Sequence, residues 1–169
     1  MRNRFFAALA GAVALAFVVT HAATTTAPLA DAAERGDVVA VQDLIRKHAD
    51  LNAAQADGMT ALHWAALNGN SNLVGVLLTA KAAVEPKTRL GDYTPLHLAA
   101  ERGHGDVVAR LLAAGSKPAA ATTTGVQAIH MAADAGSVDA IKALLDKGAD
   151  VNAKDTTHGR TPSPYGEGV

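Results

Sequence analysis

The chain contains no cysteine among its 169 residues. Disulfide bonds, thiolate nucleophiles, cysteine-ligated zinc and lipid attachment through a cysteine are therefore all excluded. Aromatic residues are scarce as well, at 4%, so a hydrophobic core has to be built from aliphatic side chains. Alanine is abundant among these, and it favours helices.

The chain also lacks an excess of charge of either sign. Its 15 Lys and Arg residues stand against 16 Asp and Glu residues, for a net charge of −1, and no run of basic residues stands out. Neutralising a nucleic-acid backbone requires clustered basic side chains. The composition therefore argues against nucleic acid as a main partner.

Motifs of common catalytic sites are absent too. The sequence has no Gly-x-Ser-x-Gly, no phosphate-binding glycine loop and no His-Glu-x-x-His. No nucleophile stands beside a plausible base. We therefore expect no enzyme and no cofactor.

The N-terminal segment holds the one long apolar run. Arg2 and Arg4 precede the run from Phe5 to Val19, and small residues follow it. At about 15 residues the run is shorter than the roughly 20 that span a bilayer, and its order is typical of a secretory signal peptide. We predict a signal peptide over residues 1–22, with cleavage after Ala22 and export across a bacterial inner membrane. The protein would then be periplasmic or secreted, touching the membrane only before cleavage; the alternative is an uncleaved membrane anchor.

The rest of the chain repeats with a period of 33 or 34 residues. Leucine or isoleucine, glycine and paired alanine recur at fixed steps, as in Leu29, Leu62, Leu96 and Ile129, in Gly36, Gly69, Gly103 and Gly136, and in Ala32-Ala33, Ala65-Ala66, Ala99-Ala100 and Ala132-Ala133. Several kinds of position that share one period indicate a stack of repeated structural units.

Each unit is expected to contain two short helices. In the stretch TPLHLAAERGHG, Thr94 suits the N-cap and Pro95 the first turn of a helix. Gly103 suits the left-handed conformation that often ends a helix. A second helix is expected over about 106–114. Such a pair cannot bury both of its faces alone, so the units must stack.

The stretches DGMTALHWAALNGN, DYTPLHLAAERGHG and DKGADVNAKD resemble the ankyrin repeat, with its Thr-Pro-Leu-His signature. The resemblance covers about residues 28–162. It implies an all-α solenoid of stacked helix pairs, with β-turn fingers projecting at right angles and a concave face that binds other proteins. We predict about four repeats plus a broken fifth, divided as a capping repeat at 23–54, repeats at 55–87, 88–121 and 122–154, and an incomplete fifth repeat and tail at 155–169.

Some units depart from the pattern. Gly75 lies inside the second helix of the second unit, which costs about 0.5–1 kcal/mol relative to alanine. Asp92 stands where the turn glycine is usual, and Gln127-Ala128 replaces Thr-Pro, so we expect the fourth unit to lose its helix cap. After Pro162 no helix of the family can follow, which favours truncation of a longer array. The apolar face led by Leu144 and Leu145 is then expected to lie open.

Three histidines invite a metal interpretation, because they recur one per repeat. Stacked units would hold His63, His97 and His130 about 10 Å apart, too far for one zinc ion. The resemblance instead implies a structural role in the turns. The structural motif residues are Thr60, His63, Thr94, Pro95, His97 and His130.

Residues expected to face the groove between fingers and first helices are the candidates for protein binding. They are Asp57, Met59, Leu67, Asn68, Leu90, Tyr93, Glu101, Arg102, Thr124, Val126 and Asp134. Apolar and aromatic side chains among charges are typical of an interface centre, although an ordinary mixed surface is the alternative. The sequence favours a monomeric, non-enzymatic binding module in the bacterial envelope. Alternatives are an accessory to oxidative-stress defence and an exported effector acting on host proteins.

Overall fold

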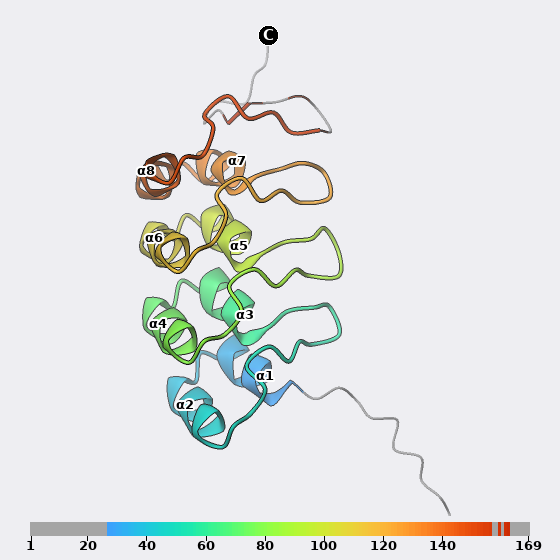
Figure 1. Cartoon of the computed structure of the whole chain (residues 1–169), viewed down its shortest axis with the longest axis vertical. Coiled ribbons are helices and arrows are strands. Elements are labelled where there is room, and N and C mark those ends of the chain that lie inside the picture. The colour runs from blue at the N-terminus through green and yellow to red at the C-terminus, as the bar shows by residue number, and fades with distance from the viewer. Residues whose placement is uncertain (1–26, 157–158, 160, 163–169) are drawn as a thin grey trace, which may run out of the picture.

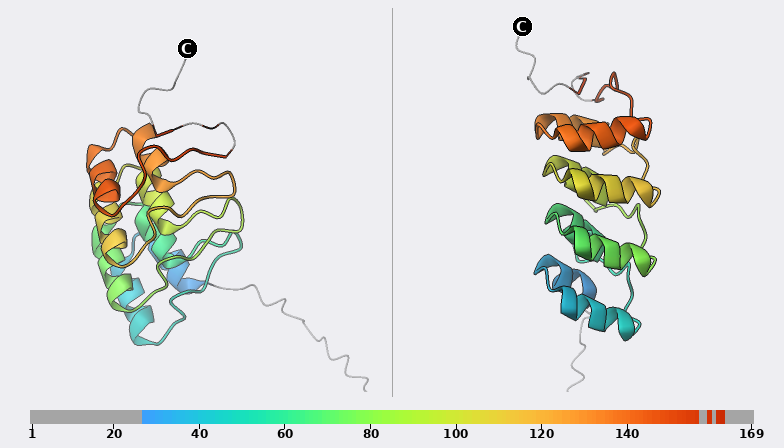
Figure 2. Two further views of the ribbon diagram at one scale, coloured as in Figure 1. Left: turned by 45° about the horizontal axis from the view of Figure 1, so that its top comes forward. Right: turned by 90° about the vertical axis from the view of Figure 1, so that its left-hand side faces the viewer.

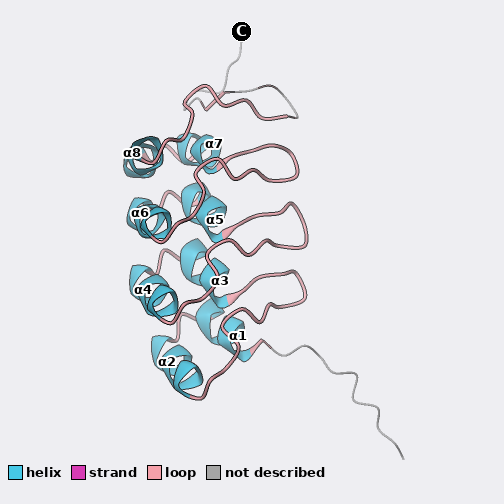
Figure 3. Cartoon of the chain, viewed as in Figure 1, coloured by secondary structure: helices cyan, strands magenta, loops and turns pink. Residues whose placement is uncertain are grey.

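The computed structural model describes residues 27–156, 159, 161 and 162 of the chain. This described part contains eight short helices and no β-strand (Figure 1, Figure 3). The helices are α1 (Pro28–Glu34), α2 (Val38–Arg46), α3 (Ala61–Leu67), α4 (Ser71–Thr79), α5 (Pro95–Glu101), α6 (Gly105–Ala113), α7 (Ala128–Asp134) and α8 (Val138–Asp146). The second helix of the third unit thus starts and ends one residue earlier than expected.

The helices form four pairs that stack along one axis. The first helices of the pairs, α1, α3, α5 and α7, make an inner row, and α2, α4, α6 and α8 make an outer row (Figure 1, Figure 2). Within the outer row α4 packs on α6 and α6 on α8, whereas α2 and α4 approach each other less closely. The predicted all-α solenoid of four stacked units is confirmed.

The core between the two rows is aliphatic, as the scarcity of aromatic residues requires. The repeated leucine position, Leu29, Leu62, Leu96 and Ile129, is at most 1% exposed in all four units. The paired alanines beside it are also buried, and their small side chains let the inner helices pack against each other. The period in the sequence therefore marks the line of contact between neighbouring units.

Helix ends follow the local signals in the sequence. Thr94 is the N-cap of α5 and Pro95 its first residue, as predicted. Gly103 follows the end of α5 with a φ of +71°, a left-handed conformation that glycine adopts without strain. Asp92, at the usual glycine position of its turn, takes a φ of +57°. Its carboxylate pairs with Lys87 at 2.8 Å.

The segments between helix pairs project to one side as fingers. They comprise residues 47–60, 80–94 and 114–127, and the described part of the chain after residue 146 (Figure 2). Backbone hydrogen bonds join each finger tip to the next. Arg89 N–H donates to the Asp57 carbonyl at 2.8 Å, Thr123 N–H to Gly91 at 3.0 Å, and Thr156 N–H to Thr124 at 3.2 Å. The finger that would begin a fifth unit is therefore held in register with the other three.

The C-terminal end of the stack differs in part from expectation. Leu145 is 40% exposed, but Leu144 is completely buried. The prediction that Leu144 lies on an open face was wrong, because this side chain of α8 points into the core. Val138 lies on the exposed side with Leu145. Most of the predicted tail at 155–169, including Tyr165, lies outside the described residues.

Candidate functional site

The repeated histidine joins two neighbouring fingers through both of its ring nitrogens. In the third unit, Nδ1 of His97 lies 3.1 Å from the backbone nitrogen and 2.8 Å from the hydroxyl of Thr94. Nε2 lies 3.0 Å from the carbonyl oxygen of Ala120 in the next finger. An N–H on Thr94 donates to Nδ1, so the ring proton sits on Nε2 and donates to Ala120. The imidazole is therefore neutral.

The same arrangement recurs in the second and fourth units. Nε2 of His63 reaches the carbonyl of Tyr93 at 3.1 Å, and Nε2 of His130 reaches that of Ala153 at 3.0 Å. Burial lowers the pKa of His63 and of His97, and their hydrogen bonds to carbonyls offset only part of this effect. Both ring nitrogens of each histidine are occupied by the turns, which supports the structural role.

The cap of the fourth unit is half retained. Gln127 N–H still donates to Nδ1 of His130 at 3.2 Å. The side-chain oxygen of Gln127, however, is buried with no hydrogen-bond partner. The expectation that this unit loses its cap thus holds for the hydroxyl contact of threonine, but the histidine keeps its share.

A hollow of about 270 Å³ lies where the second and third fingers meet α5. We call it the finger groove; its lining residues are Asp57, Met59, Thr88, Leu90, Tyr93, Leu98 and Glu101. Five of these seven are among the eleven residues predicted from the sequence to bind a partner. The structure therefore brings part of the predicted set into one concave feature.

The finger groove has an apolar floor and two acidic side chains. Met59 is only 7% exposed and lies at its base, whereas Leu90 is 83% exposed at the finger tip. The Tyr93 ring stands edge-on to that of His97, with centroids 6.2 Å apart. Asp57 and Glu101 are exposed, and no basic residue lines the hollow.

Comparison with known proteins explains this arrangement. The family model for ankyrin repeats in three copies matches residues 5–89, 29–121 and 80–155, which together cover most of the chain. The chain belongs to the ankyrin-repeat family. Among curated proteins, it is 33% identical over 87 residues to palmitoyltransferase Hip14 of Drosophila melanogaster, covering 52% of this chain and 14% of that protein. It is 36% identical over 107 residues to the ankyrin repeat and KH domain-containing protein mask-1 of Caenorhabditis elegans, covering 60% of this chain and 4% of that protein.

Both relatives are far longer than the matched segment, so the likeness concerns the ankyrin repeats and not the remainder of either protein. Ankyrin repeats are typical non-enzymatic modules for protein–protein interaction, and this chain is a module of that kind. The enzyme name of Hip14 belongs to a protein of which 14% is matched.

The other predicted binding residues of the ankyrin stack lie outside the finger groove. Arg102 and Asp134 are exposed near the ends of α5 and α7, and Leu67 is half-buried at the end of α3. Asn68 is exposed, and its side-chain amide donates to the Glu34 carbonyl of the preceding unit at 3.2 Å. Thr124 is exposed and Val126 half-buried in the fourth finger.

Two further features of the ankyrin module bear on function. Over the described residues, no group of three or more His, Cys, Asp or Glu side chains is placed to hold a metal ion. None of the described helices is long and apolar enough to cross a membrane.

The sequence analysis missed a second and larger hollow, of about 750 Å³, on the outer helices. We call it the outer hollow; it is lined by Gln42, Ile45, Arg46, Ser71, Asn72, Gly75, Val76, Thr79, Ala80 and Arg110. A signal for it exists in the sequence. Gly75 had been weighed only as a cost to helix stability, and the lack of charge from Ser71 to Thr79 had not been considered.

Proposed function

We propose that this ankyrin-repeat module holds a partner protein on the surface between its inner helices and fingers, with the finger groove at the centre of the contact. The observation that carries the proposal is the convergence of Leu90, Tyr93 and Glu101 on one hollow. An exposed leucine and an aromatic ring beside a charge are the kind of group that dominates binding energy at interfaces.

The charge of the finger groove indicates what the partner presents. Asp57 and Glu101 lie at a hollow that no basic side chain lines, and the nearby Lys87 is already paired with Asp92. A lysine or arginine of the partner, carried beside an apolar side chain, would complement both the carboxylates and the apolar floor. Such complementarity favours specificity and association rate.

Binding to the finger groove can be tested with two substitutions at exposed positions. We expect the double variant Leu90→Ser and Glu101→Lys to bind a partner isolated from the source cells at least tenfold more weakly than the unchanged protein does. The partner would be identified by mass spectrometry after capture, and the dissociation constant measured by calorimetry. Neither side chain is buried, so the fold should persist.

Lys142→Glu on the outer helix α8 is the matched control, because it also reverses a charge at an exposed position. It should leave the dissociation constant unchanged. If the double variant binds as tightly as this control, the partner does not use the finger groove.

We further propose that residues 1–22 export the module across a bacterial inner membrane. The support is the order of charged, apolar and small residues in that segment, which lies outside the described residues. After expression in a bacterium, we expect periplasmic protein whose first residue is Ala23. Leu15→Arg should interrupt the apolar run and leave the full-length chain in the cytoplasm. Fractionation followed by N-terminal sequencing measures both, and an uncleaved chain in the membrane fraction would instead indicate an anchor.

A further inference from the structure

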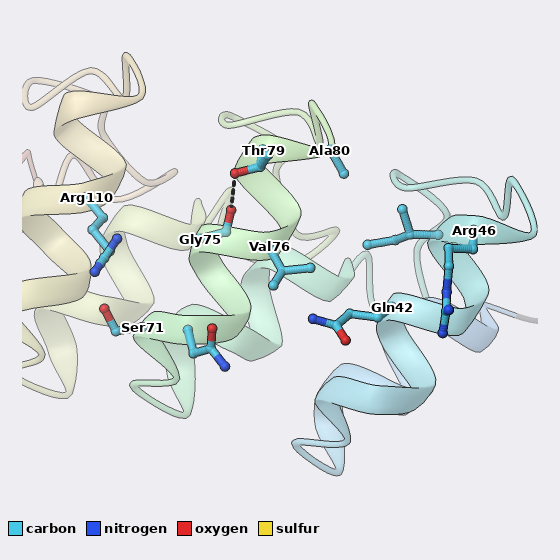
Figure 4. A pocket seen from close by; sticks show the side chains of 10 residues that line it. Gln42, Arg46, Ser71, Gly75, Val76, Thr79, Ala80 and Arg110 are labelled. Carbon is cyan, nitrogen blue, oxygen red and sulfur yellow. Dashed lines mark hydrogen bonds between the residues drawn. The ribbon is translucent and has the colours of Figure 1, made fainter.

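The outer hollow lies on the side of the stack opposite the fingers (Figure 1). Figure 4 shows Gln42 and Arg46 of α2 on one side of the α4 surface and Arg110 of α6 on the other, with Gly75 and Val76 between them. The hollow widens where α2 and α4 approach each other less closely than the other neighbouring outer helices do.

Gly75 leaves the centre of the outer hollow open, and the fold does not require a glycine there. The residue lies inside α4, and it is not among the glycines with a positive φ. A Cβ atom at this position would meet only Nη1 of Arg110, at 3.8 Å. The corresponding positions of the other outer helices carry Gln42, Ala109 and Lys142. Alanine would stabilise the helix more, so the distinct consequence of Gly75 is space.

The floor of the outer hollow is uncharged. No Asp, Glu, Lys or Arg occurs in α4, whereas each of the other three outer helices carries charges. Val76 and Ile45 are both half-buried and contribute apolar surface, and the hydroxyl of Thr79 is turned to the Gly75 carbonyl at 2.8 Å. An aliphatic side chain laid over Gly75 would therefore displace water from apolar surface.

The flanks of the outer hollow are basic. Arg46 forms an ion pair with Asp43 of its own helix, while Arg110 has no ion pair among the described residues. No carboxylate lines the hollow, and the amides of Gln42 and Asn72 add hydrogen-bonding groups at its edge. A guanidinium binds a carboxylate through two parallel hydrogen bonds, so Arg110 is placed to accept an acidic group.

We propose that the outer hollow is a second docking site, which binds a peptide segment of a partner protein carrying aliphatic side chains next to carboxylates. An aliphatic side chain would lie over Gly75 and Val76, with a carboxylate at Arg110. The hollow is a trough open along three helices, and such a shape suits a length of polypeptide better than a small molecule, which pockets usually enclose. Because the finger groove lies across the inner helices, both sites can be occupied at once.

Peptide selection tests this proposal without a known partner. A phage-displayed library of random dodecapeptides is selected on the purified protein and, in parallel, on Gly75→Leu, which fills the hollow while favouring the helix. Peptides enriched only on the unchanged protein are expected to combine Leu, Ile or Val with Asp or Glu. Their dissociation constants, measured by fluorescence anisotropy, should rise at least tenfold in Gly75→Leu and in Arg110→Glu.

Two control variants match these changes outside the hollow. Ala109→Leu adds the same side chain at the equivalent position of α6, and Arg89→Glu reverses an exposed charge on a finger; both should bind the peptides unchanged. Thermal unfolding verifies that every variant is folded. The proposal is overturned if no peptide distinguishes the unchanged protein from Gly75→Leu, if the selected peptides lack acidic residues, or if Arg110→Glu binds within twofold. It is equally overturned if phosphatidylglycerol vesicles, and not the peptides, lose binding in the two test variants.

Discussion

Replacing His97 by alanine should lower the free energy of unfolding by about 3–5 kcal/mol, the largest loss expected from a single polar side chain here. The substitution removes the acceptor for the buried backbone N–H and the hydroxyl of Thr94, and the donor to the Ala120 carbonyl. Each buried polar group left without a partner costs about 1–3 kcal/mol, and a completely buried side chain also leaves a cavity. Urea unfolding followed by circular dichroism measures the change.

The fourth unit supplies the matched comparison. His130→Ala should cost less than His97→Ala, because Nδ1 of His130 accepts only the backbone N–H of Gln127 and the adjacent Gln127 oxygen is already without a partner. Gln127→Thr should act in the opposite direction and add about 1 kcal/mol, since it replaces an unsatisfied buried oxygen by the hydroxyl that the other two units place beside Nδ1. An equal loss in the two alanine variants would mean that the contacts of Thr94 do not contribute.

The stacking of the ankyrin units could be predicted from the sequence because stacking is what the period records. A position such as Leu96 contacts the same neighbours in each unit, and so keeps its residue type from one unit to the next. The caps were predictable for the same reason, since Thr94 and Pro95 act on their own helix end. Leu144 was misplaced because the pair Leu144-Leu145 was treated as one face, whereas adjacent residues of a helix point about 100° apart.

The binding surfaces were less predictable, because they consist of the positions that the period does not constrain. Five residues of the finger groove could be named from their place in the repeat, but whether they share a hollow depends on how closely neighbouring fingers approach. The outer hollow depends on the spacing between α2 and α4 and on the absence of a side chain at Gly75. Spacing between helices is a property of the packed stack and leaves no motif in the sequence.

Stability should fall as the pH is lowered below about 6.5, because two buried histidines must stay neutral in the fold. Burial lowers the pKa of His63 and of His97 in the native protein, whereas in the unfolded chain they titrate near the ordinary value of about 6.5. Below that pH the unfolded state binds protons that the native state does not, so the free energy of unfolding decreases with falling pH. With two protons involved, the slope should approach about 2.7 kcal/mol per pH unit, and it flattens where the native histidines themselves protonate.

Protonation would also break specific contacts, because a proton on Nδ1 of His97 turns the acceptor of the Thr94 N–H into a donor. The loss of stability below pH 6.5 therefore begins in the turns that join one unit to the next. Urea unfolding at a series of pH values measures the slope, and His97→Gln, which still offers an amide N–H toward Ala120, should reduce it by about half. A slope that is the same in this variant would place the titrating groups elsewhere. If His97 supplies half of it, the turns between ankyrin units are where this protein senses mild acid.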